Sequence, residues 1–252
     1  MKRMEAVAYI NHVMCTIDWA RMEAAVAAED GGGPGDEICS VSLQEWEHYV
    51  RTENQCMKSR AFSWYDGKVY LVEPNMRLHG SIVWEISRAI LYTVGFLNDF
   101  LANSGSSYVQ SMRLLEPDAS FGPTPSVPGV KCPPRMTWGE YHTLKVEVGV
   151  ARGWRKLDRR AEEWSHFPGV QYVLCVRVSN DLKTRQYRLD SVVGGHIETP
   201  RAPIVDIVNP TTVTFDSRRL LGLPPDGVVP LGFSDPTVTI DLFAAIGRAA
   251  RD

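Results

Sequence analysis

The sequence is poor in the features that define several classes of protein, beginning with cysteine. Its 252 residues include only five cysteines, and at least sixteen residues separate each from the next. This spacing excludes a zinc knuckle, a CxxC redox pair and a disulfide framework, and it fits a reducing compartment. We therefore expect an intracellular protein, cytoplasmic or nuclear.

Long apolar runs are absent as well. The best candidate for a membrane span, residues 82–101, contains Glu85, Arg88 and Asp99 and is better interpreted as a buried amphipathic helix. The N-terminal stretch mixes charged residues with apolar ones, unlike a signal peptide. The sequence thus predicts no contact with a membrane.

The chain also lacks an excess of positive charge. It has 27 Lys and Arg against 30 Asp and Glu, a formal net charge of -3. The molecule as a whole therefore has no net attraction for nucleic acid, and any such site must be a local patch. Hydrophobic residues make up 44%, enough to bury a core in one large domain or two small ones.

The order of glycine, proline and apolar segments divides the chain into parts. Residues 1–35 are expected to form an accessory helix that ends in a Gly-rich linker, Gly31 to Gly35. Residues 40–252 are expected to form the main domain, with a core at 40–180 and a β-rich C-terminal extension at 186–252.

Local signals predict the elements of that domain. Ser42 and Glu45 form a capping box that opens a helix to about Val50, and Asp66-Gly67 is a hairpin turn between two short strands. Helices are expected at 80–101, 155–165 and 241–250, and strands at 109–115, 143–148 and 170–178. This mixture predicts an α/β (α+β) fold.

One constellation could carry chemistry. Asp118 follows one predicted strand and Glu147 lies inside the next, so the two carboxylates converge if residues 109–118 and 143–149 form adjacent strands with helix 80–101 on one face. Two carboxylates and a backbone carbonyl, here that of Val148, are a ligand set that Mg²⁺ or Mn²⁺ accepts. Lys145 and Glu147 share one face of their strand, where a charged residue among valines needs a partner.

Cations follow on the next predicted helix. Lys156, Arg160 and Trp164 are spaced four residues apart and share one stripe. A cation there could hold a phosphate or stabilise developing negative charge. A positive patch would favour a nucleic-acid partner, and its members would be the basic residues Lys145, Arg152, Arg155, Lys156, Arg159 and Arg160.

The order of several segments resembles a known family. The chain contains SLQEWEHY, FSWYDGKVYLVEP, a histidine (His79) at the head of a helix, EPDAS, LKVEVGV, a basic helix ending in Trp164, and PGVQYVLCV. Together they are similar to the Uma-type restriction endonuclease domain of the PD-(D/E)XK nuclease superfamily, over roughly residues 40–180.

The resemblance implies a fold, a reaction and site residues. The expected fold is a restriction-endonuclease-like central mixed sheet flanked by helices, and the reaction is metal-dependent hydrolysis of DNA phosphodiesters. Asp118 would be the PD aspartate and Glu147 the acidic residue of the (D/E)XK element. Gly149 stands where that element has lysine, so Lys156 or Arg160 is expected to replace it, with Lys145 a further candidate for orienting or deprotonating the water.

Plainer structural roles remain open for each of these residues. Glu116 to Asp118 can be a simple turn, and Glu147 can be a strand residue paired with Lys145 or Arg155. Lys156 and Arg160 can be a solvated helix face paired with Glu163. His79 can be a cap, and Glu73 and Glu85 are weaker candidate ligands. Core or edge packing is the preferred role of four tryptophans, Trp84, Trp138, Trp154 and Trp164.

Two functions follow from this pattern. The first is a magnesium-dependent nuclease that acts on DNA. The second is a catalytically inactive form of the same fold that binds a protein or nucleic acid. A homodimer is left open by the sequence.

Overall fold

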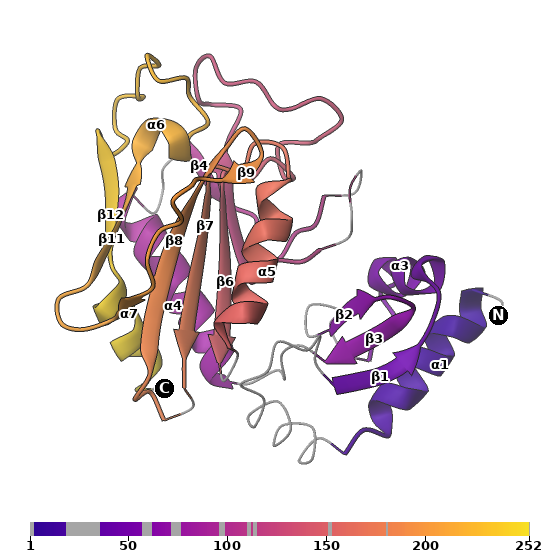
Figure 1. The fold of residues 1–252 in the computed structure, drawn as a ribbon. Coiled ribbons are helices and arrows are strands. Elements are labelled where there is room, and N and C mark those ends of the chain that lie inside the picture. The colour runs from indigo at the N-terminus through magenta and orange to yellow at the C-terminus, as the bar shows by residue number, and fades with distance from the viewer. Residues whose placement is uncertain are drawn as a thin grey trace.

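A computed structural model describes residues 3–18, 36–56, 62–71, 77–95, 99–109, 112, 115–150, 153–179 and 181–251. Within these ranges the chain forms six helices and twelve strands in three sheets, which confirms the predicted α/β (α+β) class. Figure 1 shows two lobes, a small N-terminal lobe and a larger lobe built around the main sheet.

The N-terminal lobe consists of helices α1 (Arg3–Cys15) and α3 (Leu43–Arg51) and of strands β1 (Asp36–Ser40), β2 (Phe62–Tyr65) and β3 (Lys68–Leu71). The predicted capping box opens α3, since the Ser42 hydroxyl accepts from the Glu45 N–H and the Glu45 carboxylate accepts from the Ser42 N–H. The predicted turn joins β2 to β3, with φ of 48° at Asp66 and 80° at Gly67. Local signals therefore predicted the start of α3 and the β2–β3 turn, whereas strand β1 was not predicted.

Helix α1 shares the small core of this lobe. Its apolar residues Val7, Ile10 and Met14 pack with Tyr49 of α3 and Val69 of β3. The expected accessory helix is thus joined to residues 36–71 by a common core. The Gly-rich linker Gly31 to Gly35 lies outside the described residues.

The main sheet has the strand order β10-β8-β7-β6-β5-β4, and β9 pairs with β8 at one side. Its strands are β4 (Leu101–Asn103), β5 (Ala119–Pro123), β6 (Leu144–Val150), β7 (Tyr172–Val178), β8 (Arg185–Val193), β9 (His196–Ile197) and β10 (Val205–Asp206). β6 and β7 are parallel and the other pairs antiparallel, so the sheet is mixed. Every residue of β6 is buried, as expected for a strand covered on both faces.

Helices cover the two faces of this sheet, as Figure 1 shows. On one face α4 (Arg77–Thr93) places Ile82, Ile86 and Ile90 against Val146 and Val148 of β6. On the other face α5 (Trp154–Ser165) and β7 form a second apolar cluster. Helix α5 contributes Leu157, Ala161 and Trp164, and β7 contributes Val173 and Cys175. β6 therefore lies between two separate cores.

The C-terminal segment contributes to the sheet and also extends beyond it. Strand β8 pairs with β7 over seven residues, so the main sheet continues past residue 180. The remainder forms a ribbon of β11 (Thr212–Asp216) and β12 (Thr237–Asp241) with helices α6 (Ser217–Leu220) and α7 (Leu242–Ala249). Helix α7 packs beside α4 on the same side of the sheet.

The predicted strand at 109–115 is wrong. Among its described residues none is in a strand, and the neighbour of β6 is β5, which starts at Ala119. The sequence of β5, Ala-Ser-Phe-Gly-Pro, looks like a turn because it contains glycine and proline. Its glycine instead permits a close approach, since a Cβ on Gly122 would lie 1.8 Å from the Tyr141 carbonyl oxygen.

The helix predicted at 80–101 is shorter than expected at its C-terminal end. α4 ends at Thr93, and Gly95 has φ of 86°, the left-handed conformation that commonly follows a helix. Leu101 begins β4, which pairs with β5 and extends the sheet. Leu101 is therefore buried as part of a strand, and it does not extend the apolar face of α4.

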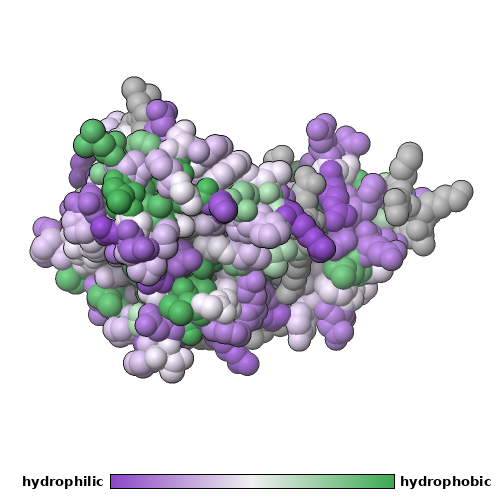
Figure 2. All heavy atoms as spheres, turned by 90° about the horizontal axis from the view of Figure 1, so that it is seen from above, coloured by the Kyte–Doolittle hydropathy of each residue, from purple (hydrophilic) through white to green (hydrophobic). Residues whose placement is uncertain are grey.

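The surface carries no single large apolar area in the view of Figure 2, where apolar side chains gather in separate patches over the larger lobe. The fully exposed Leu231 and the largely exposed Val228 are among the described apolar residues at the surface. No helix of the described residues is long and apolar enough to cross a membrane.

Candidate functional site

Asp118 lies at the end of the sheet, directly before β5. Its Oδ2 accepts a hydrogen bond of 2.7 Å from the Val148 N–H and lies 3.2 Å from His79 Nε2, and its side chain is 9% exposed. Its own N–H donates to the Val146 carbonyl. The predicted proximity of Asp118 to the strand of Glu147 is therefore present, although Asp118 precedes its strand where the sequence predicted that it follows one.

Glu147 is the neighbour of Val148 on β6, and its side chain points to the α5 face. Its Oε1 accepts a hydrogen bond of 2.6 Å from Trp164 Nε1 and lies 3.4 Å from an Arg160 guanidinium nitrogen. Only 1% of the residue is exposed. A carboxylate buried so deeply requires such partners, and here a neutral donor and a cation from one helix supply them.

Arg160 is the cation of α5 at this site. Its Nη2 donates to the Glu116 carbonyl at 2.6 Å, and its Nη1 lies 3.7 Å from Glu163. Burial opposes the charge, but Glu147, Glu163 and Asp118 together raise the pKa of Arg160 above its ordinary value. Arg160 therefore remains protonated. It can stabilise negative charge, but it cannot act as a general acid or base.

The register of α5 bears on the two candidates for the missing lysine. The α5 cation in contact with Glu147 is Arg160, one helical turn beyond Lys156. Lys156 itself is half-buried in the first turn of the helix. Of these two candidates, Arg160 is placed against Glu147.

Lys145 shares the face of Glu147 but is sealed inside the protein. Its Nζ lies 2.8 Å from His142 Nδ1 and 4.4 Å above the centre of the Trp164 ring, and 1% of the residue is exposed. Burial lowers the pKa of Lys145 to about 7, while Glu147 opposes the shift and Arg160 adds to it. Lys145 therefore cannot belong to a surface patch, and the mostly buried Arg160 contributes little to one.

His142 is the member of this cluster that sequence reasoning missed. Its Nε2 lies 2.9 Å from the Gly139 carbonyl, which only accepts, so Nε2 carries the proton and Nδ1 accepts from Lys145. Burial, and then the nearby Lys145, lower the pKa of His142 to about 3. The available signal was the spacing of His142, three residues before Lys145 and directly before the strand predicted at 143–148.

The residues present fit a divalent cation in their chemistry. Val148 N–H points to Asp118, and the carbonyl of the same strand residue points to the same side. Asp118, Glu147 and this carbonyl are therefore oxygen donors at one end of β6, and each carboxylate has about four acceptor positions. Among the described residues there is no group of three His, Cys, Asp or Glu side chains that could hold a metal ion.

Other candidate ligands separate from this group. Glu85 is buried on α4, where Arg88 and Arg248 pair with it. Glu73 lies outside the described residues. His79, for which a capping role was the alternative, lies in the first turn of α4 and places its Nε2 3.2 Å from Asp118 Oδ2.

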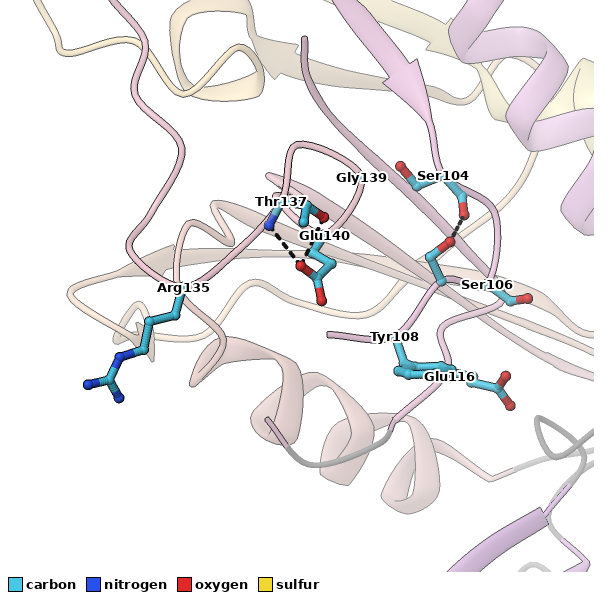
Figure 3. A pocket seen from close by; sticks show the side chains of 9 residues that line it. Ser104, Ser106, Tyr108, Glu116, Arg135, Thr137, Gly139 and Glu140 are labelled. Atoms are coloured by element: carbon cyan, nitrogen blue, oxygen red, sulfur yellow. Dashed lines mark hydrogen bonds between the residues drawn. The ribbon is translucent and has the colours of Figure 1, made fainter. Parts of the chain in front are cut away.

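A polar pocket of about 890 Å³ adjoins the carboxylate site. Its lining includes Glu116, whose carbonyl accepts a hydrogen bond from Arg160. The full lining is Ser104, Ser106, Ser107, Tyr108, Glu116, Arg135, Thr137, Gly139 and Glu140. Figure 3 shows that Thr137 and Glu140 are tied to each other and that Arg135 points away from the other side chains. The pocket thus includes Glu116, two residues before Asp118 in the chain.

The chain matches no family model, and no curated protein is found to be similar to it. The geometry at the end of β6 is therefore the basis for a functional assignment.

Proposed function

We propose that this chain is a metal-dependent nuclease of the restriction-endonuclease-like type that hydrolyses DNA. One observation carries the proposal: Asp118 and Glu147 flank the Val148 main chain at one end of the buried strand β6, with Arg160 against Glu147 and near Asp118. Buried carboxylates held beside a buried arginine are costly to fold, and such clusters concentrate at functional sites.

Each side chain has a definable role in this proposal. Asp118, Glu147 and the Val148 carbonyl hold Mg²⁺ or Mn²⁺, which when bound lowers the pKa of water and polarises the phosphate. Arg160 stabilises the negative charge that grows on phosphorus-bound oxygens. Trp164 is a positioning residue, because its Nε1–H binds one oxygen of the Glu147 carboxylate, and His79 lies beside the carboxylate of Asp118.

A first experiment measures metal binding apart from cleavage. Titration calorimetry with Mg²⁺ and Mn²⁺ should show binding by the wild type and none by Asp118→Ala. Circular dichroism should show that the variant keeps its fold. The matched control is Glu162→Gln, an exposed carboxylate on α5, which should bind metal as the wild type does. Unchanged affinity in Asp118→Ala would remove the metal site.

A second experiment measures nicking of supercoiled and single-stranded circular DNA with each metal. Asp118→Asn should cut the rate by about 100-fold or more, which is the effect of losing one electrostatic stabiliser. Arg160→Ala should be similarly impaired and Arg160→Lys partly active, whereas Lys156→Ala tests the alternative register. Should Lys156→Ala be inactive and Arg160→Ala active, the assignment of the cation is wrong.

A catalytically inactive binding module is the second candidate. It is favoured by Gly149 in place of the motif's lysine and by the Trp164 hydrogen bond, which already satisfies one oxygen of Glu147. This candidate predicts that no divalent metal supports cleavage of any nucleic acid while binding persists. The two experiments above separate it from the nuclease.

A further inference from the structure

The outer face of α4 carries aromatic side chains that the fold does not bury. Trp84 is 66% exposed and Tyr92 65% exposed, whereas Ile82, Ile86 and Ile90 on the opposite face are fully buried. The sequence-based expectation that Trp84 is a packing residue is therefore wrong. The outer face of such a helix is normally charged or polar, so two large exposed aromatics need an explanation.

A cation lies between these two aromatics. Trp84, Arg88 and Tyr92 are spaced four residues apart and form one stripe, and the guanidinium carbon of Arg88 lies 5.8 Å from the centre of the Tyr92 ring. The exposed Arg77 lies on the same side at the start of the helix. We call Arg77, Trp84, Arg88 and Tyr92 the α4 stripe.

Within α4 and its contact Arg248, cations outnumber carboxylates, although the whole chain is negative. The one carboxylate of α4 is Glu85, which is buried and bonded to both Arg88 and Arg248. Three arginines, Arg77, Arg88 and Arg248, thus face one carboxylate. This surplus suits an anionic partner.

We propose that the α4 stripe binds single-stranded nucleic acid, with bases stacked on Trp84 and Tyr92 and phosphates at Arg88 and Arg77. Aromatic faces interleaved with cations are the composition of surfaces that bind single strands, because every base has a face to stack. Trp84 and Tyr92 are separated by about 12 Å along the helix, or about three to four nucleotides at 3.4 Å each. A duplex keeps its base faces stacked internally and cannot use such a stripe.

A second copy of this chain fits the stripe less well. In a symmetric dimer across the stripe, a two-fold axis through its centre brings Arg88 against Arg88 of the other copy, because Arg88 lies midway between the two aromatics. Like charges in contact oppose such an interface. The positive charge therefore favours a polyanion over self-association.

This inference goes beyond the proposed function, because the stripe lies on the outer side of α4 and not at the carboxylates. The two can fail separately. A strand bound in the presence of a chelator, with no cleavage possible, reports on the stripe alone.

The test measures anisotropy of fluorescein-labelled oligothymidine with the full chain in chelator. Trp84→Ala should weaken binding by about 10-fold and the double variant with Tyr92→Ala by about 100-fold, from the size of base stacking on aromatics. Trp84→Phe should restore part of the affinity. Tyr9→Ala, a partly exposed aromatic on α1, is the matched control and should bind normally.

Further measurements separate the alternatives. Arg88→Gln should make the dependence of log affinity on log salt shallower by about 0.7, the contribution of one phosphate contact to a single strand. Oligouridine should bind about as well as oligothymidine, since stacking does not read the sugar. The proposal is overturned if the Ala variants bind like wild type, if duplex DNA binds as tightly as the single strand, or if only anionic vesicles bind. It is also overturned if Trp84→Ala dissociates a wild-type dimer in sedimentation without affecting oligonucleotide binding.

Discussion

Strand β6 meets different surroundings on its two faces. On the α4 side Val146 and Val148 pack in one apolar cluster with Ile82, Ile86 and Ile90. On the α5 side Lys145 and Glu147 are equally buried, among Trp164, Arg160 and His142. Burial of the apolar face stabilises the fold. Burial of the charged face costs free energy, because its charged groups are removed from water. The α5 face of β6 is thus the part of the sheet where buried charges oppose stability.

The largest expected effect breaks the charged face by removing Glu147. Glu147→Ala should lower the free energy of unfolding by about 3–5 kcal/mol, because Arg160 and Lys145 would remain buried without their anion. Urea denaturation followed by tryptophan fluorescence measures it. Glu147→Gln keeps the acceptor for Trp164 and should cost less, and Glu162→Ala at the surface should cost little. A more stable Glu147→Ala protein would show that repulsion among the carboxylates governs the site.

The next effect tests the apolar face at the adjacent position. Val146→Ala should lower the free energy of unfolding by about 2 kcal/mol, since it removes two buried carbon groups and leaves a small cavity. The same denaturation experiment measures it. This loss should be the same at every pH in the range where the protein folds, because no titrating group is altered. A strong pH dependence would mean that the two faces are coupled through β6.

A third expectation concerns pH, and it uses the buried His142. The pKa of His142 is about 3 in the folded chain against 6.5 for an ordinary histidine. Between these values the unfolded chain binds the additional proton, so stability should fall as pH falls from 6.5 toward 3, by at most about 1.4 kcal/mol per pH unit.

The comparison with His142→Gln isolates this effect, because carboxylates titrate in the same range. The difference in unfolding free energy between wild type and variant should change with pH below 6.5 and be constant above it. A constant difference throughout would show that His142 has the same pKa in the folded and unfolded chains, so that burial does not lower it.

The same contrast explains what the sequence could predict. The capping box at Ser42 and the turn at Asp66-Gly67 depend on residues a few positions apart, and both were predicted. The alternation of charged residues and valines in β6 identified Glu147 as exceptional. These signals are local and retain their meaning without the rest of the fold.

Features set by distant contacts were not predictable in this way. β5 is a strand because Gly122 admits the carbonyl of Tyr141, nineteen residues on. The choice between Lys156 and Arg160 depends on how the chain turns after β6, which no local pattern fixes. Tryptophan is a residue type that often packs in a core. Only the packing of α4 shows that Trp84 lies on the exposed side of this helix.

The smallest expected effect concerns a charge at the surface of α5, the helix that also carries Arg160. Arg159 is half-exposed, lies 3.6 Å from Glu163 and stands 4.4 Å from the centre of the Tyr65 ring in the N-terminal lobe. Exposed ion pairs and exposed cation–π contacts each contribute about 1 kcal/mol or less. Arg159→Gln should therefore cost about 1 kcal/mol of unfolding free energy, several-fold less than Glu147→Ala on the buried side of the sheet. High salt should reduce the cost by screening the ion pair, and Arg159→Lys should retain part of it. A loss as large as that of Glu147→Ala would mean that the contact with Tyr65 holds the two lobes together, and that burial is not what separates strong from weak charges in this protein.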